Sequence, residues 1–266
     1  MIKKEFLSGF GEIYSGLGEF LATTEAREPI GKYKTTRAMN DLQSEHYSRV
    51  DHCGATGYSS AKNDLLNGRN VDVIKKARSG AVMGTKKTMV YSVAGSSVSV
   101  GRALTGKPNC MRKKVKVSKP ITKNIILDVG VSCYVNAKEY ATAGAALVNY
   151  ITDLQKHYNV NLYVGFTTYI DGTPFGCFVK IMEAGRAFSA ARLSYMLTVP
   201  AFLRVFGILW IGKTATKYSL GFGAPLATEN KKLYHKFINT LIPGANALSM
   251  AEIIKNDYKI ETEATA

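Results

Sequence analysis

Acidic side chains are absent from one long part of the chain. Residues 73–127 contain no Asp or Glu, whereas the same span contains thirteen Lys or Arg. Solubility alone does not require acids to be excluded over so long a stretch, although a solvated basic surface without a partner is the alternative interpretation. The span predicts a strong positive field on one part of the molecule, and such a field favours polyanions.

Cysteine is also scarce. The four cysteines, Cys53, Cys110, Cys133 and Cys177, lie far apart and form no CxxC pair. This spacing argues against a disulfide scaffold and is typical of reduced, mostly buried thiols in a cytosol.

No long hydrophobic run is present. The most apolar stretch, residues 196–211, is interrupted by Pro200 and Arg204 and is too short to span a bilayer. At the start of the chain, Glu5 and Glu12 interrupt the apolar segment that a signal peptide would need. We therefore expect a soluble intracellular protein without a membrane partner.

Recognisable catalytic constellations are missing as well. Four histidines and four cysteines form no assignable Ser-His-Asp or Cys-His set, and nothing marks a pair of catalytic carboxylates. We predict that the protein is not an enzyme and that it needs no cofactor or resident metal.

The positive charge is unevenly distributed along the chain. Residues 1–124 carry 22 basic and 10 acidic side chains, whereas residues 125–266 carry 13 and 10. We predict a basic N-terminal region over residues 1–124 that packs on a sheet-forming core over residues 125–266. A single domain that includes both regions is the alternative.

The order of predicted elements indicates the fold class. Residues 1–50 indicate turns, a short helix or an arm, and residues 59–76 a helix; two short strands are predicted at 88–93 and 115–121. The core then has an apolar strand at 125–131, a helix at 137–157, strands at 160–170 and 175–182, and a helix at 188–197. A fourth strand at 205–211 and helices at 229–241 and 248–257 complete it. This order predicts an α/β fold with a central, mostly parallel sheet and helices on both faces.

One stretch satisfies the phosphate-loop pattern GxxxxGK[ST]. It runs from Gly207 to Thr214, but its four middle residues are Ile, Leu, Trp and Ile, which are typical of a buried strand. We interpret it as a strand that runs into a basic turn. A nucleotide-binding enzyme that uses Gly212, Lys213 and Thr214 is the alternative.

Asp128 and Ser132 suggest a second alternative. They follow the central strand, where α/β sheets place ligand sites. The segment resembles the DxSxS metal motif of von Willebrand factor A domains, whose oxygen ligands suit a hard cation. Gly130 stands where that motif has its first serine, so one ligand is missing. A metal-dependent interaction module is therefore an alternative, and a buried or capping Asp128 is the default interpretation.

Basic residues interleaved with aromatic residues favour nucleic acid. Lysine and arginine neutralise phosphates without reading sequence, and aromatic rings stack on unpaired bases, so the combination favours single strands. For any one tyrosine, packing in the core is the alternative role. The candidate nucleic-acid-binding residues are Lys75, Lys76, Arg78, Lys86, Lys87, Tyr91, Arg102, Lys107, Arg112, Lys113, Lys114, Lys116 and Lys119.

Several segments together resemble a family of phage proteins with a von Willebrand factor A-like core. They are Gly54-Ala-Thr-Gly-Tyr-Ser-Ser, Asp64-Leu-Leu-Asn-Gly68, the glycine- and serine-rich residues 93–108 with Met111, and residues 125–154. Within that family, the size and basic charge are similar to those of single-stranded-DNA-binding RNA polymerase cofactors of short-tailed phages. The resemblance implies a transcription cofactor that recruits a phage RNA polymerase to opened middle promoters, in the cytoplasm of the infected bacterial host. It supplies no residue-level DNA site, and a homo-oligomer stays open.

Overall fold

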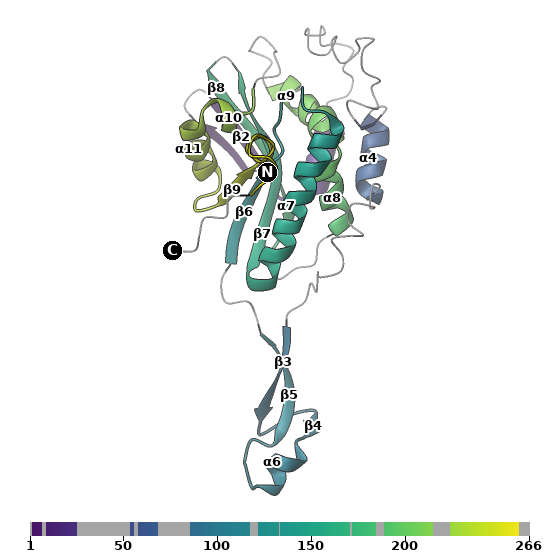
Figure 1. Cartoon of the computed structure of the whole chain (residues 1–266), viewed down its shortest axis with the longest axis vertical. Helices are drawn as coiled ribbons and strands as arrows, with labels where there is room; N and C mark the ends of the chain where they lie inside the picture. Colours follow the sequence, from purple (N-terminus) through teal and green to yellow (C-terminus); the bar gives the residue numbers. More distant parts are fainter. Residues whose placement is uncertain are drawn as a thin grey trace.

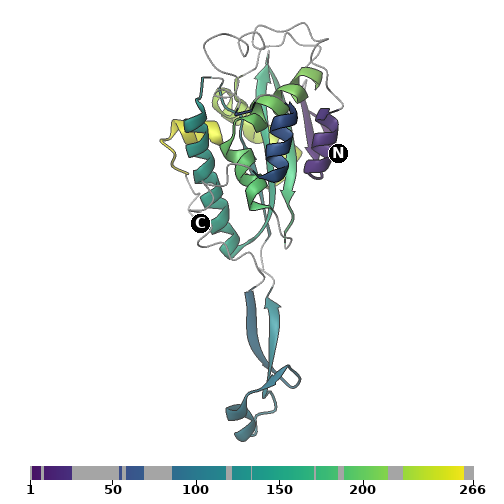
Figure 2. The same ribbon diagram turned by 90° about the vertical axis from the view of Figure 1, so that its right-hand side faces the viewer.

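The structure is a computed structural model, and it describes residues 2–6, 9–25, 54–55, 58–68, 86–117, 122–132, 134–170, 172–184, 189–214 and 224–260. These residues form a layered α/β body from which a small three-stranded finger projects (Figures 1 and 2). The finger has basic but no acidic side chains, and the buried apolar side chains of the described residues lie in the body.

A six-stranded sheet forms the centre of the body. Its order is β1 (Ile2–Phe6), β2 (Gly9–Tyr14), β8 (Thr173–Met182), β7 (Asn159–Ile170), β6 (Thr122–Asp128) and β9 (Asn246–Ser249). The pairs β2–β8, β6–β7 and β6–β9 are parallel, whereas β1–β2 and β7–β8 are antiparallel. The predicted α/β class with a mostly parallel central sheet is therefore confirmed.

Helices cover both faces of this sheet, because its inner strand β6 is apolar on both faces. Successive residues of a strand point to opposite faces. Ile125 and Leu127 accordingly join one buried cluster, and Ile126 joins the other. The first face is covered by α1 (Leu17–Glu25), α4 (Tyr58–Asn67), α7 (Ala137–His157) and α8 (Ala190–Thr198). Helix α12 (Met250–Lys255) lies beside α7. The second face is covered by α10 (Leu226–Glu229) and α11 (Lys231–Leu241) (Figure 1).

Helix α7 matches its predicted bounds because its sequence carries both a start signal and a helical apolar period. Asn136 accepts a hydrogen bond from the backbone N–H of Glu139, and the Glu139 side chain accepts one from Asn136, which completes a capping box. Tyr140, Ala143 and Leu147 are fully buried, with a spacing that keeps them on one side of the helix.

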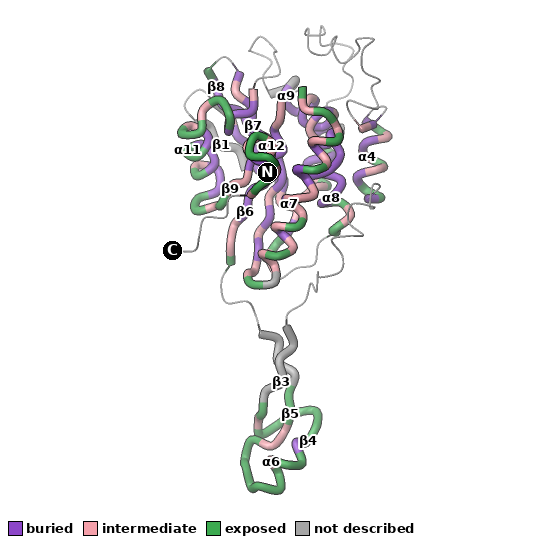
Figure 3. The backbone as a smooth tube through the Cα atoms, viewed as in Figure 1, coloured by how far each residue is buried: buried purple, intermediate pink, exposed green. Residues whose placement is uncertain are grey.

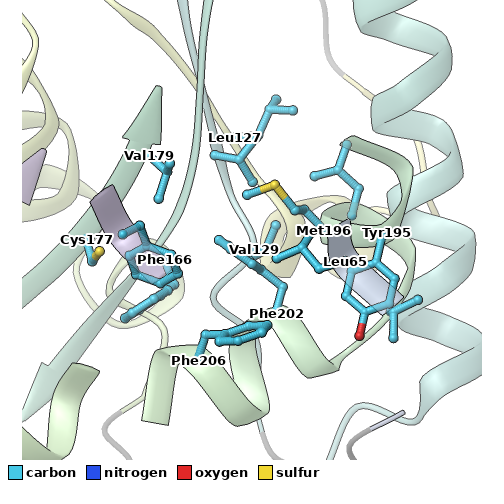
Figure 4. Packing of buried hydrophobic residues seen from close by; sticks show 14 of the residues in the cluster. Leu65, Leu127, Val129, Phe166, Cys177, Val179, Tyr195, Met196, Phe202 and Phe206 are labelled. Carbon is cyan, nitrogen blue, oxygen red and sulfur yellow. The ribbon is translucent and has the colours of Figure 1, made fainter. Parts of the chain in front are cut away.

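The first face of the sheet holds the larger core. Aromatic rings from separate helices meet there, with Phe202 and Phe206 close to Val129 and Phe166 of the sheet region (Figure 4). Leu65 of α4 is fully buried in the same cluster. Residues on both sides of position 124 therefore share one hydrophobic core.

Of residues 1–50, the structure describes 2–6 and 9–25. The short helix expected in this region is present as α1, whereas the residues before it form strands β1 and β2 of the sheet and not an arm. Strand β2 pairs in parallel with β8, from Phe10 opposite Phe175 to Tyr14 opposite Val179. Glu12 in β2 is buried, and one of its carboxylate oxygens accepts hydrogen bonds from the Tyr14 hydroxyl and, at 2.7 Å, from the Trp210 indole N–H. These donors compensate for the removal of the carboxylate from water.

The predicted strand at residues 205–211 is wrong. These residues belong to a π-helical turn, η2 (Phe202–Gly207), and to helix α9 (Ile208–Thr214). Phe202, Phe206 and Trp210 are fully buried and recur at every fourth position, which is a helical period. A short apolar run does not by itself distinguish a buried strand from a buried helix.

Two smaller differences concern the C-terminal part. The helix expected at 248–257 begins at Met250, and the residues before it form β9, which pairs with β6. Among the described residues, no single helix reaches the length and apolar character of a membrane span; α8 and the stretch Phe202–Ile211, which meet at 74°, do so only when taken as a pair.

We expect Gly144→Ala to destabilise the body. An ideal Cβ at Gly144 of α7 would lie 1.9 Å from the backbone oxygen of Leu197 in α8, so the two helices would have to separate. Such overpacking costs on the order of 1–3 kcal/mol of unfolding free energy. Urea unfolding followed by far-UV circular dichroism measures it.

Gly18→Ala is the matched control. Gly18 lies in α1 with no atom within 4 Å of an added Cβ, so alanine should stabilise the helix by about 0.5–1 kcal/mol. Equal unfolding midpoints for the two variants would contradict the close approach of α7 to α8.

Candidate nucleic-acid interface

The finger consists of residues 86–117 and carries charge of one sign only. It contains eight Lys or Arg and no Asp or Glu. Figures 1 and 2 show it projecting from the body as an elongated ribbon. Cations that the sequence placed near one another along the chain are therefore also gathered in space.

Three strands and a short helix build the finger. Strand β3 (Lys86–Ser92) pairs antiparallel with β5 (Met111–Val117), and β5 also pairs with β4 (Ser97–Val98), after which α6 (Val100–Leu104) begins. The predicted strands at 88–93 and 115–121 correspond to β3 and to the end of β5, although residues 118–121 lie outside the described residues.

Backbone contacts hold the end of the finger together. An added Cβ at Gly95 would lie 2.3 Å from the Arg112 carbonyl oxygen, so this close approach needs glycine. The backbone N–H groups of Ser96 and Ser99 donate to the carbonyl oxygens of Arg112 and Cys110 at 3.0 and 2.7 Å. Hydrogen bonds thus fix a segment that has little apolar core of its own.

The strand register divides the cations between the two faces of the ribbon. In an antiparallel pair, residues directly opposite each other share a face. Tyr91 lies opposite Arg112, and Val90 opposite Lys113. By the same alternation, the positions that share a face with Tyr91 and Arg112 are Lys87, Met89, Lys114 and Lys116. The backbone register therefore places the positions of four basic residues, and of the single aromatic residue of the finger, on one face.

Tyr91 and Arg102 form a stacked pair on the finger. The Arg102 guanidinium carbon lies 4.3 Å from the centre of the Tyr91 ring, and Arg102 Nε donates to the Asn109 carbonyl oxygen at 3.0 Å. The Tyr91 side chain remains 47% exposed. A planar cation and an aromatic ring in contact provide flat surfaces against which a nucleobase can stack.

The structure brings together most of the candidate residues but does not describe all of them. Lys107, Arg112 and Lys113 are exposed on the finger, and Arg102 is half-buried against Tyr91. Lys86, Lys87, Lys114 and Lys116 lie in its strands, where the backbone alone is described. Lys75, Lys76, Arg78 and Lys119 lie outside the described residues.

One basic–aromatic pair was missed by the sequence interpretation. The Lys123 ammonium lies 4.0 Å from the centre of the Tyr158 ring, at the amino end of β6, where the chain enters the body from the finger. Lys123 is part of the acid-free span, and this was the available signal. Its partner follows it by 35 positions, so only the pairing of β6 with β7 brings the two residues together.

Asp128 lies at the carboxyl end of β6 and is buried. Its Oδ1 accepts hydrogen bonds from the backbone N–H groups of Gly130 at 2.8 Å and Thr167 at 3.0 Å, and its Oδ2 accepts one from the Thr167 hydroxyl. Burial raises the pKa of Asp128 to about 7, although these hydrogen bonds act in the opposite direction. Its burial and these hydrogen bonds support the default interpretation, in which Asp128 is a buried residue that stabilises the fold.

Ser132 takes part in a local turn. Its hydroxyl accepts a hydrogen bond from the backbone N–H of Tyr134 at 3.3 Å. Among the residues that are described, no group of three or more His, Cys, Asp or Glu could hold a metal ion. The arrangement at Asp128 and Ser132 therefore gives the metal-dependent alternative no support.

The phosphate-loop pattern lies in helices. Gly207 ends η2, and Gly212, Lys213 and Thr214 lie in α9. A phosphate-binding loop has to leave a strand and present free backbone N–H groups to the anion. A helix with a fully buried Trp210 in the middle of the pattern does not provide that loop.

Comparison with known proteins identifies a family but no function. Residues 9–261 match the model of a family described as "Domain of unknown function (DUF7192)". No curated protein and no solved structure matches the chain.

We expect the stability of the protein to depend on the proton of Asp128. Its pKa is raised from 3.8 to about 7 in the folded state, so the folded protein binds this proton more tightly than the unfolded chain does. The stabilisation is complete below about pH 4 and is lost as the pH rises to about 7, a change on the order of a few kcal/mol.

Asp128→Asn should remove this part of the pH dependence. Urea unfolding at a series of pH values, with Asp153→Asn on the exposed side of α7 as control, measures the difference. A pH profile of Asp128→Asn parallel to that of the wild type would show that Asp128 does not titrate in this window.

Proposed function

The chain belongs to the family described as a domain of unknown function (DUF7192), and we propose from its geometry that it is a single-stranded-DNA-binding protein that holds the strand on its finger. The observation that carries the proposal is the projecting ribbon of residues 86–117 with eight cations and no acid. A strand bound there neutralises its phosphates without competition from neighbouring carboxylates.

The spacing of the cations suits an extended strand. Residues at alternate positions of a β-strand are about 6.8 Å apart along the strand. Arg112, Lys114 and Lys116 follow one another at this interval on the same face of β5. Consecutive phosphates of an extended polynucleotide are separated by a similar length, so each cation can meet one phosphate.

Stacking favours a single strand over a duplex. Tyr91 is half exposed on the same face and contacts the flat guanidinium of Arg102. Unpaired bases can stack on such surfaces, whereas bases in a duplex have their faces covered by their neighbours.

The resemblance to phage RNA polymerase cofactors supports a narrower role. In that role the protein binds the opened strand of a middle promoter and recruits a phage-encoded RNA polymerase, without catalysis of its own and in the cytoplasm of the infected bacterium. Single-stranded DNA and the polymerase are then its partners.

A competition gel shift tests the proposal directly. Wild-type protein bound to a labelled single-stranded DNA should be displaced by unlabelled single strands at lower concentration than by a duplex of the same length, because only the single strand can stack on Tyr91 and Arg102. RNA of the same sequence is the third competitor. Equal displacement by duplex and single strand would overturn the stacking argument.

Arg112→Ala with Lys114→Ala should weaken binding and reduce its salt dependence. Both positions lie on the face of β5 that Tyr91 shares, whereas Lys113 lies on the opposite face. Removing two phosphate contacts should reduce the slope of log K against log salt by about 1.4 for a single strand. Fluorescence anisotropy with a labelled oligonucleotide over a salt series measures the slope.

Lys138→Ala with Lys232→Ala is the matched control for charge. Both lysines are exposed on helices of the body, Lys138 on α7 and Lys232 on α11, so the net charge changes equally while the finger is intact. If both double variants change the slope to the same extent, binding depends on total charge and not on the finger.

Tyr91→Ala should reduce single-strand affinity at constant salt slope. Loss of one stacked base costs about 1–3 kcal/mol, whereas Tyr91→Phe keeps the ring and should bind like the wild type. The same anisotropy assay measures both variants. An alanine variant that binds as tightly as the phenylalanine variant would show that Tyr91 only packs against Arg102.

A further inference from the structure

Exposed apolar side chains are concentrated at the end of the finger. Of the seven large hydrophobic residues that are exposed in the described part of the chain, five lie between positions 91 and 104. Leu104 is 83% exposed, Val93 73% and Val100 66%, and Val98 is half exposed. Single exposed apolar residues need no explanation, but a concentration of them at one end of a protruding element marks a contact surface.

The tip, defined as residues 93–104, presents these side chains on a fixed backbone. The backbone N–H groups of Arg102 and Ala103 both donate to the Ser99 carbonyl oxygen at 3.0 Å, and the Ser99 N–H donates to Cys110. Ser99 itself is buried. Because the backbone is already ordered, insertion of these side chains into a partner costs little conformational entropy.

We propose that the tip is a wedge that inserts Val100 and Leu104 between bases where a single strand leaves a duplex. This inference rests on the proposed function. A DNA strand held along β3 and β5 leads to the tip. Where that DNA strand enters a duplex, base stacking is already interrupted, and there it meets the exposed aliphatic side chains of the tip.

The chemistry of the tip suits this position. Apolar side chains that enter a base step separate the bases, while neighbouring cations hold the phosphates on either side. Lys107 and Arg112 are exposed near the tip and can supply those contacts. Unstacking costs least at the end of a duplex, which directs the wedge to a junction and not to continuous duplex.

Charge and composition favour nucleic acid over a lipid surface. Both surfaces attract the cations of the finger, but membrane interfaces are typically contacted by Trp, Tyr or Phe. Residues 93–104 contain none of these, and Tyr91, the single aromatic residue of the finger, is stacked with Arg102.

The test uses three oligonucleotides: a single strand, a blunt duplex, and a fork with 2-aminopurine at its junction. Wild-type protein should bind the fork most tightly and should increase 2-aminopurine fluorescence, because the base at the junction becomes unstacked. The full-length Val100→Ser, Leu104→Ser double variant should lose on the order of tenfold in fork affinity and should lose the fluorescence increase, while single-strand affinity is retained.

Leu66→Ser is the matched control. Leu66 is an exposed leucine on α4 of the body, and its replacement should leave fork binding unchanged. Leu104→Ser alone, at the most exposed of the tip positions, provides a second variant if the double variant alters the finger. Retained single-strand affinity shows that the finger is folded.

Four outcomes separate the inference from the proposed function. Absence of single-strand binding by the wild type would overturn both. Single-strand binding with equal fork affinity for wild type and tip variants would overturn only the wedge. Binding of the wild type, but not of the tip variants, to phosphatidylglycerol–phosphatidylcholine vesicles with unchanged fork binding would assign the tip to a lipid surface. Loss of a wild-type dimer in the tip variants, seen by sedimentation with unchanged fork binding, would assign it to a second copy of the chain.

Discussion

Strand β6, which lies between β7 and β9 in the sheet, is apolar on both of its faces, and the arrangement of the body follows from the need to cover them. Ile125, Ile126 and Leu127 are fully buried. Each contributes about 1.5–3 kcal/mol when it leaves water, so neither face can remain exposed. Segments from the beginning and the end of the chain meet this requirement together, with α1 and α4 on one face and α11 on the other.

This constraint also determines where charge can lie. Among the described residues, the two buried acids, Glu12 and Asp128, each accept several hydrogen bonds, and the buried Arg204 donates one to the Val135 carbonyl oxygen. Burial still raises the pKa of Asp128. The finger contributes eight of the chain's 35 basic residues outside the body, and most of its residues from 91 to 113 are exposed (Figure 3). This part of the positive charge is therefore kept away from the apolar core.

The sequence predicted the elements whose signals are local. Helix α7 has a capping box and a regular apolar period, and β7 and β8 are long and rich in β-branched or aromatic residues. The helix through Phe206 and Trp210 was mistaken for a strand because residues 202–211 are apolar apart from Arg204, so the polar face by which a helix is recognised is missing. Strands β2 and β9 were missed because tertiary packing stabilises them: β2 contains Gly11, which lies against the Leu241 side chain, and β9 has only four residues.

The sequence predicted the positive charge of the candidate site but not its three-dimensional arrangement. The absence of acidic residues indicated the finger residues, yet the pairing of β3 with β5 joins residues 19 to 31 positions apart, which no local pattern specifies. Likewise, Val98 and Val100 alternate as in an ordinary strand, and the sequence does not indicate that they are exposed beside the close approach of Gly95 to Arg112.

The pairing register of β3 with β5 also affects how the chain can evolve. Lys86 is paired with Val117, so the two ends of the finger lie side by side. An insertion that leaves and re-enters its host at adjacent points can be lengthened, shortened or exchanged without altering the order of the strands in the host sheet. Relatives of this protein can therefore keep one scaffold while their extensions diverge in length, charge and target.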